Sequence, residues 1–155
     1  MKIRFGDIVE IETGKGLAYA MYTHNHERPP KFGAVICVFD CLYKSRPGNI
    51  VEIRKFSARF ATFFPLQAAV DRRIVEVVGN LPIPEALRPF PLFRDGVADP
   101  KTKKVASWWL WDGEKEWQIG ALTPDQRKLP IRSVWNDSIL IERIEEGWRP
   151  ENDPR

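Results

Sequence analysis

The sequence contains one nearly unbroken apolar run of seven residues, Gly33-Ala34-Val35-Ile36-Cys37-Val38-Phe39. Its length and its β-branched side chains fit a strand better than a helix. Because both alternating sets of side chains are apolar, we expect a central strand that is buried on both faces. A sheet therefore lies at the centre of the predicted fold.

Two further strands are predicted on the N-terminal side of this run. The stretch 6–12 is short and rich in β-branched residues, and the stretch 17–23 follows it after a turn at 13–16 that contains two glycines. Three strands within about forty residues, joined by short connections, predict a curled antiparallel sheet or a small barrel.

The C-terminal side of the run adds strands with less regular spacing. We expect strands at 50–54 and 74–79, an extended proline-rich connection at 81–91, and a hairpin of 105–111 with 117–122 around Asp112-Gly113. The stretch 58–69 stays ambiguous between helix and strand, because its phenylalanines have helical spacing while Pro65 interrupts any long helix.

Two short helices are predicted near the C-terminus. Thr123 and Gln126 form a capping box for the first, and Asn136 or Asp137 caps the second. In the second helix Leu140, Ile144 and Trp148 share one face. The expected fold is a strand-dominated α+β domain over residues 1–150, either a curled antiparallel sheet or an SH3-like partial barrel with two short C-terminal helices. Residues 151–155 are expected to form a frayed tail.

The composition excludes several classes of protein. Of 155 residues 43% are hydrophobic and the formal net charge is +3, which predicts one buried core and no polybasic tail. We find no apolar run long enough to cross a membrane, and no hydrophobic leader follows Met1. Two cysteines make no disulfide framework, so a reducing cytoplasm is the expected compartment.

One set of residues has donor atoms that zinc accepts: His24 and His26, with Cys37 and Cys41. Their spacing matches no common zinc motif, and Cys37 lies inside the apolar run, where a cysteine behaves as a small hydrophobic residue. The same apolar flanks oppose a reactive thiolate. We therefore expect no metal, no cofactor and no catalytic residues, and the sequence predicts a protein that is not an enzyme.

Four of the six tryptophans lie in the predicted hairpin: Trp108, Trp109, Trp111 and Trp117. On a strand Trp109 and Trp111 share one face while Trp108 and Leu110 share the other. One aromatic face can pack in the core, and the other can form a contact surface. The predicted binding surface consists of Trp109, Trp111 and Trp117, rimmed by Arg94, Lys101, Lys103 and Lys104.

Nucleic-acid binding is an alternative interpretation of the basic residues. Arg54, Lys55, Arg59, Arg72 and Arg73 could contact phosphates, and aromatic side chains could stack on bases. A net charge of only +3 gives this reading little support.

Several short motifs carry a family resemblance through their order and spacing. They are Gly6–Ile11 with Ala18-Tyr19, Gly33–Ile36 continuing to Asp40, Trp109–Gly113, Ile119-Gly120-x-Leu122, Leu129–Ile131, Val134–Asp137 and Leu140-x-x-Arg143-Ile144. With these motifs the chain resembles the immunity protein 26 family of bacterial polymorphic toxin systems. The resemblance implies a non-enzymatic cytoplasmic protein that binds and neutralises one cognate toxin, and it transfers no catalytic residues.

The opening strand is also similar to the first strand of SH3-like barrels, which include growth-inhibiting endoribonuclease toxins. This second similarity implies a small SH3-like nucleic-acid-binding or ribonuclease-type module. The chain is longer than those toxins and lacks their arginine-proline pattern before the third strand. The first function is therefore the expected one, with a protein toxin as partner, no membrane, and nucleic acid not favoured.

Overall fold

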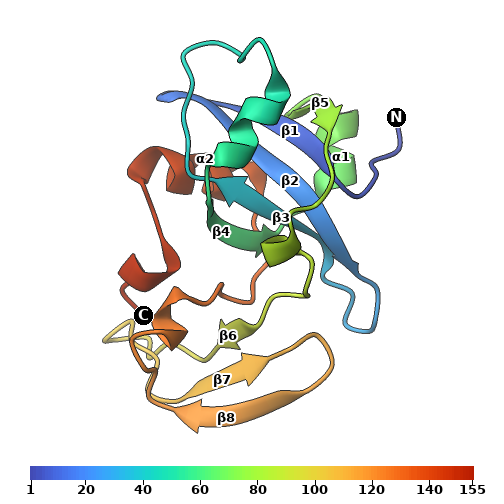
Figure 1. The fold of residues 1–155 in the computed structure, drawn as a ribbon. Coiled ribbons are helices and arrows are strands. Elements are labelled where there is room, and N and C mark those ends of the chain that lie inside the picture. The colour runs from blue at the N-terminus through green and yellow to red at the C-terminus, as the bar shows by residue number, and fades with distance from the viewer.

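The computed structural model describes residues 1–155 as a strand-dominated α+β fold with two antiparallel sheets (Figure 1). The large sheet has the order β4-β3-β2-β1-β5, and its strands are β1 Asp7–Thr13, β2 Gly16–His26, β3 Gly33–Phe39, β4 Ala58–Phe63 and β5 Glu76–Asn80. The small sheet has the order β6-β7-β8, and its strands are β6 Phe93–Asp95, β7 Trp108–Trp111 and β8 Glu116–Gly120.

The fold class is as predicted, and β3 is the central strand that its composition indicates. Every residue of β3 from Val35 to Phe39 is buried. Ile36 and Val38 belong to the main core on one face of the large sheet, while Phe39 belongs to a second cluster on the other face. The sheets do not close into a barrel, because β4 and β5 end the large sheet at opposite edges. The predicted antiparallel sheet is therefore observed as an open sheet of five strands, accompanied by a smaller sheet of three.

A segment without its own strand assignment connects the two sheets. The Arg94 amide donates to the Pro130 carbonyl (2.8 Å), and the Arg132 amide donates back to the Arg94 carbonyl (2.9 Å). Three residues later the Trp135 amide donates to the Phe63 carbonyl of β4 (3.0 Å). Residues 131–135 therefore run between β4 and β6 and hold the small sheet against the edge of the large one (Figure 1).

The two α-helices are α1 Leu66–Asp71 and α2 Asp137–Glu146. The predicted face of α2 is buried, since Leu140, Ile144 and Trp148 all belong to the main core. The Asn136 side chain caps this helix by accepting from the Ile139 amide (2.8 Å). Gly147 ends it at φ 72°, a backbone conformation that disfavours side chains with a Cβ.

The predicted strand at 50–54 is wrong, because Ile50–Lys55 forms a 3-10 helix. The Asn49 side chain accepts from the Val51 amide (3.1 Å) and starts the turn. Ile53 of this turn belongs to the second cluster, on the face of the large sheet opposite the main core. The ambiguous stretch at 58–69 contains both elements that were considered. It forms β4, breaks at Pro65, and continues as α1.

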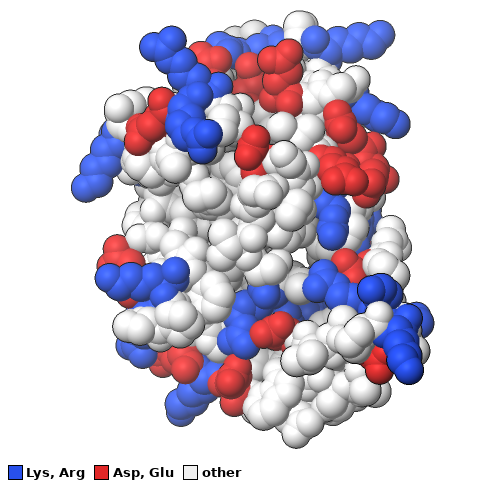
Figure 2. All heavy atoms as spheres, turned by 180° about the vertical axis from the view of Figure 1, so that it is seen from behind, with Lys and Arg blue, Asp and Glu red and all other residues white.

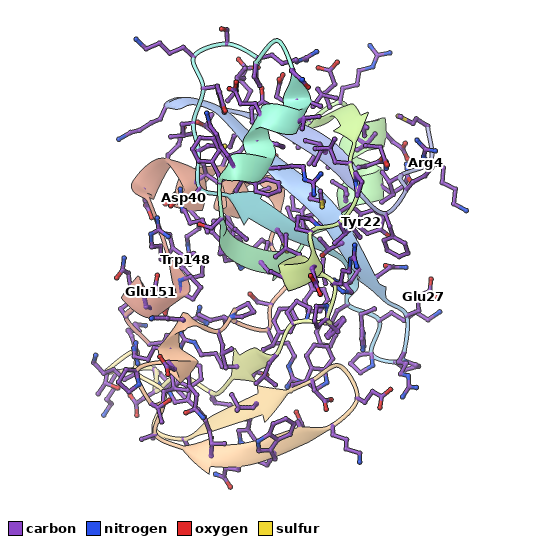
Figure 3. All side chains as sticks on the ribbon, in the orientation of Figure 1. Arg4, Tyr22, Glu27, Asp40, Trp148 and Glu151 are labelled. Carbon is purple, nitrogen blue, oxygen red and sulfur yellow. The ribbon has the colours of Figure 1, made fainter.

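The first predicted C-terminal helix is only a 3-10 turn, Gln126–Lys128, and other 3-10 turns lie at Glu85–Leu87 and Pro150–Asn152. The last of these differs from the frayed tail that the sequence predicts. Pro150 and Asp153 are buried. The Asp153 carboxylate holds the turn in place, since it accepts from the Trp148 indole (3.2 Å) and the Arg155 guanidinium (2.9 Å). Figure 3 shows Trp148 and Glu151 together at this C-terminal side of the molecule.

No helix in the structure combines the length and the apolar composition that crossing a membrane requires.

Candidate functional site

The register of the small sheet assigns each tryptophan of the hairpin to a face. Trp109 lies opposite Asp95 and Gln118, and Trp111 lies opposite Phe93 and Glu116. Residues that are directly opposite in antiparallel strands point to the same side, so Trp109 and Trp111 share a face, as predicted.

Trp117 lies on the other face of the small sheet, because it pairs with Leu110. Its side chain is 41% exposed, close to the 38% of Trp109. Trp109, Trp111 and Trp117 therefore do not form the single continuous surface that the sequence analysis expected. Two partly exposed indoles instead lie on opposite faces of one thin sheet.

Trp111 is part of the core between the two sheets, although it shares a face with Trp109. It is only 6% exposed, and its ring centroid lies 5.2 Å from that of Phe32 and 5.6 Å from that of Phe93. These rings in turn stack on Phe63 of β4. The placement of Trp111 in a binding surface is thus corrected, because the large sheet covers this end of the hairpin.

Arg94 is fully buried, which corrects its predicted place at the rim of the surface. Its Nη2 donates to the Pro150 carbonyl (2.6 Å), and its guanidinium carbon lies 4.5 Å from the Trp108 ring centroid. Burial, aided by the nearby charge of Arg127, lowers the pKa of Arg94 to about 10. Arg94 therefore joins β6 to the C-terminal turn.

The three predicted lysines lie on an ordered, exposed loop between β6 and β7. An isolated antiparallel β-bridge between Ala98 and Val105 brings the two sides of this loop together. At the tip of the loop the Asp99 carboxylate accepts from the Lys101 amide (2.7 Å). Lys104 donates to the Pro154 carbonyl (3.3 Å), and Lys103 lines a hollow beside the C-terminal turn. Lys103 and Lys104 thus face the chain end.

Trp109 lines a cleft of about 430 Å³, which we call the Trp109 cleft. It adjoins a second cleft of about 600 Å³, the His26 cleft, and both are lined by Glu116 and Arg132. The two clefts together form a groove along one face of the small sheet. In the view from behind in Figure 2, an uncharged patch lies at the bottom of the molecule, with acidic and basic residues around it.

Arg132 divides the groove, and sequence analysis missed it. Its Nη2 lies 2.6 Å from the Asp95 carboxylate and 3.0 Å from the Glu116 carboxylate, and its guanidinium carbon lies 5.0 Å from the Trp111 ring centroid. No local motif marks this residue. Its role depends on the 131–135 segment, which lies between two sheets that are distant in sequence.

His26 lies at the end of β2 and is buried. Its Nε2 is 2.9 Å from the Gly113 carbonyl, which can only accept, so Nε2 carries a proton. Its Nδ1 is buried without any partner. Sequence analysis considered His26 only as a metal ligand and missed this arrangement.

The residues considered for zinc do not come together, since the structure contains no group of three His, Cys, Asp or Glu residues able to hold a metal ion. The Nε2 of His24 is bound to the Arg88 carbonyl (2.8 Å). Burial raises the pKa of both Cys37 and Cys41 to about 11, and Asp40 adds to the shift at Cys41. Thiolate, the nucleophilic form of cysteine, is therefore scarce at neutral pH.

The candidate functional site is thus the small sheet, with the groove on one face and Trp117 on the other. Comparisons of the chain with models of known protein families, with curated protein sequences and with solved structures find no match.

Proposed function

We propose that the protein is a non-enzymatic immunity protein that binds and neutralises a cognate toxin of a bacterial polymorphic toxin system, with the small sheet as its contact surface. One observation carries the proposal. Trp109 and Trp117 remain 38% and 41% exposed, on the two faces of a sheet whose outer strand β8 has a strand neighbour on only one side.

Large aromatic side chains that remain accessible are typical of the residues that dominate protein–protein interfaces. The backbone groups along the outer side of β8 can also pair with a strand of a partner. Three consecutive residues of β8, Glu116, Trp117 and Gln118, are exposed, so both the side chains and the backbone of this strand are accessible.

The family resemblance that the short motifs carry supports a protein toxin as the partner. Two of them fall in the small sheet and its connections: Trp109–Gly113 forms the end of β7 and the following turn, and Ile119-Gly120 ends β8. The resemblance to the immunity protein 26 family therefore includes Trp109 of the proposed contact surface, while Trp117 lies between two of the motifs.

The first test is to sequence the DNA around the gene and to express any adjacent toxin domain together with this protein. We expect the two chains to purify as a stable complex and the toxin activity to be suppressed. Trp109→Ala and Trp117→Ala should each weaken the complex by roughly 30-fold, the loss expected for an interface hot spot of about 2 kcal/mol.

Phe5→Ala is the matched control, because Phe5 is an aromatic residue that is 57% exposed and belongs to the large sheet region. It should leave the affinity unchanged. A gene without a toxin neighbour, combined with salt-dependent RNA binding by the purified protein, would instead favour the nucleic-acid-binding alternative.

A further inference from the structure

The outer edge of β8 has backbone groups that no other strand pairs with. At the hairpin turn the Asp112 amide donates to the Lys115 carbonyl (3.1 Å), so these two residues form a hydrogen-bonded pair. Hydrogen-bonded and non-hydrogen-bonded pairs alternate along an antiparallel ladder, so Trp117 also bonds to β7. Glu116 and Gln118, on either side of it, therefore direct their amides and carbonyls outward. No other backbone segment bonds to these outward groups.

The inner side of the small sheet shows the same alternation. Arg94 of β6 directs its amide and carbonyl away from β7, toward the chain at 130–132. The β7 residues on either side of Leu110 therefore bond to β6, and Leu110 itself bonds to β8. Leu110 lies opposite Trp117, so both sides of the sheet assign Trp117 as the inward-bonded residue of β8.

The edge is also accessible and straight over a short stretch. β8 lies at the outer end of the molecule, where no other element covers it (Figure 1). Glu116, Trp117 and Gln118 are all exposed. Just after Gln118 the register with β7 shifts, and Gly120 has φ 80°, so the straight part of the edge ends there. An exposed and straight edge is a template for pairing with a strand of another chain.

This edge is complementary to itself in the antiparallel direction. When Glu116 of one copy lies opposite Gln118 of the other, the outward amides and carbonyls of both residues can pair. Trp117 then lies opposite Trp117 of the other copy, in a non-hydrogen-bonded pair, where cross-strand side chains are closest. Two aromatic rings in this position attract each other and lose exposed surface.

Charge and backbone shape favour this register over its two neighbours. A shift of two residues in one direction would place Glu116 opposite Glu116 of the other copy, so that like charges face each other. A shift in the other direction would place Glu116 opposite Gly120, beyond the straight part of the edge. In the register centred on Trp117, Glu116 faces an uncharged amide. Lys115 lies diagonally beside the other indole ring, whose face attracts a cation.

We propose that a second copy of this chain pairs with β8 in the antiparallel direction, centred on Trp117. The two sheets of three strands then form one sheet of six. The two-fold symmetry uses the free edge of both copies, so the assembly closes as a dimer. This inference goes beyond the proposed function. A toxin that binds Trp117 has to displace the second copy, so the dimer is the form of the protein before a toxin binds.

The dimer is tested by sedimentation equilibrium of the protein alone, at concentrations from about 5 to 500 µM. Few residues pair, so we expect a reversible equilibrium with a dissociation constant on the order of 10–100 µM. A protein that remains monomeric at the highest concentration would overturn the proposal and leave the edge to a strand of the toxin. Because the measurement contains no toxin, this result does not affect the proposed function.

Opposite charges introduced at Gln118 test the register. Gln118→Lys places a lysine opposite Glu116 at two symmetry-related positions, and it should lower the dissociation constant by roughly 3- to 10-fold. Gln118→Glu places two carboxylates opposite each other and should raise the constant by a similar factor. Ser45→Lys and Ser45→Glu are the matched controls, because Ser45 is exposed and lies outside both sheets. A change of the same sign with both Gln118 variants would contradict the register.

Trp117→Ala tests where the two-fold axis passes. It removes the central aromatic pair and should raise the dissociation constant by roughly 10-fold. Phe5→Ala, at an aromatic residue of the large sheet region that is 57% exposed, should leave the constant unchanged. Circular dichroism of both variants checks that the fold is intact. An equal dissociation constant for Trp117→Ala and the unchanged protein would show that the copies do not meet at Trp117.

Discussion

The large and small sheets each have an apolar central strand, but they differ in how fully their faces are covered (Figure 1). In the large sheet β2 and β3 have strands on both sides and packed layers on both faces, so most of their side chains are buried. In the small sheet β7 also has strands on both sides, yet Trp109 remains partly exposed. An apolar strand is therefore buried only where other elements cover its face.

The elements that cover the two sheets explain this difference. The large sheet packs against α2 and Trp135 on one face and against the 3-10 helix Ile50–Lys55 and Leu81 on the other. The small sheet is covered only where it meets the large sheet at Trp111, and where the C-terminal turn meets Arg94. Its outer part remains free, and the proposed contact surface lies there.

The largest effect is expected where the two sheets meet. Phe63 is fully buried and stacks on Phe93 of the small sheet with 4.8 Å between ring centroids. Phe63→Ala should lower the free energy of unfolding by about 3–5 kcal/mol, since it leaves a cavity among these rings. Urea denaturation followed by circular dichroism measures this loss. A midpoint equal to that of the unchanged protein would mean that the junction does not stabilise the fold.

The two tryptophans on one face of β7 provide the sharpest comparison of covered and uncovered positions. Trp111→Ala should cost about 3 kcal/mol, while Trp109→Ala should cost about 1 kcal/mol or less, although the residues are only two positions apart. The free energies of unfolding of the two variants, measured side by side, test this difference. Equal losses would refute the explanation by coverage.

The C-terminal turn that covers Arg94 should weaken at low pH. Burial alone would raise the pKa of Asp153, but hydrogen bonds from Arg155 and Trp148 outweigh it and lower the pKa to about 2. A lowered pKa in the folded state stabilises the protein above the ordinary pKa of aspartate, and this contribution is lost as the pH falls from about 4 through about 2.

Asp153→Asn removes this dependence and should cost about 1–3 kcal/mol at pH 7, because hydrogen bonds to a charged group are lost. Denaturation in guanidinium chloride at pH 7, 4 and 2.5 should show the variant approaching the unchanged protein as the pH falls. A constant difference across this range would show that the Asp153 carboxylate does not supply the stability.

The smallest effect on stability is expected at the outer strand. Trp117 is 41% exposed on the face of the small sheet opposite the groove, so Trp117→Ala should change the free energy of unfolding by roughly 0.5 kcal/mol or less. Thermal unfolding measures this change. A loss as large as that of Trp111→Ala would show that Trp117 supports the fold, and its place in the proposed contact surface would then be withdrawn.

Features that depend on neighbouring residues could be predicted from the sequence. The apolar run at Gly33–Phe39 is the buried central strand. The capping box forms between Thr123 and Gln126, whose side chains accept from each other's amides at 3.2 Å and 2.9 Å. The Asp112 carboxylate accepts from the Lys115 amide (2.8 Å) in the predicted turn. The cap and the turn form from contacts within a few residues, so the local pattern is sufficient. The strand pairs with distant segments, but its uniformly apolar composition already indicates burial on both faces.

The burial of Trp111, Arg94 and His26 could not be predicted in this way. Alternation along β7 assigns Trp109 and Trp111 to one face, but Phe63 and Phe32, which cover only Trp111, are nearly 50 and 80 residues away in the sequence. Arg94 donates to the Pro150 carbonyl, 56 positions later in the chain. The His26 side chain binds the Gly113 carbonyl, 87 positions later. Periodicity fixes the direction of a side chain, whereas its exposure depends on which distant segment packs against it, and that is set by the fold as a whole.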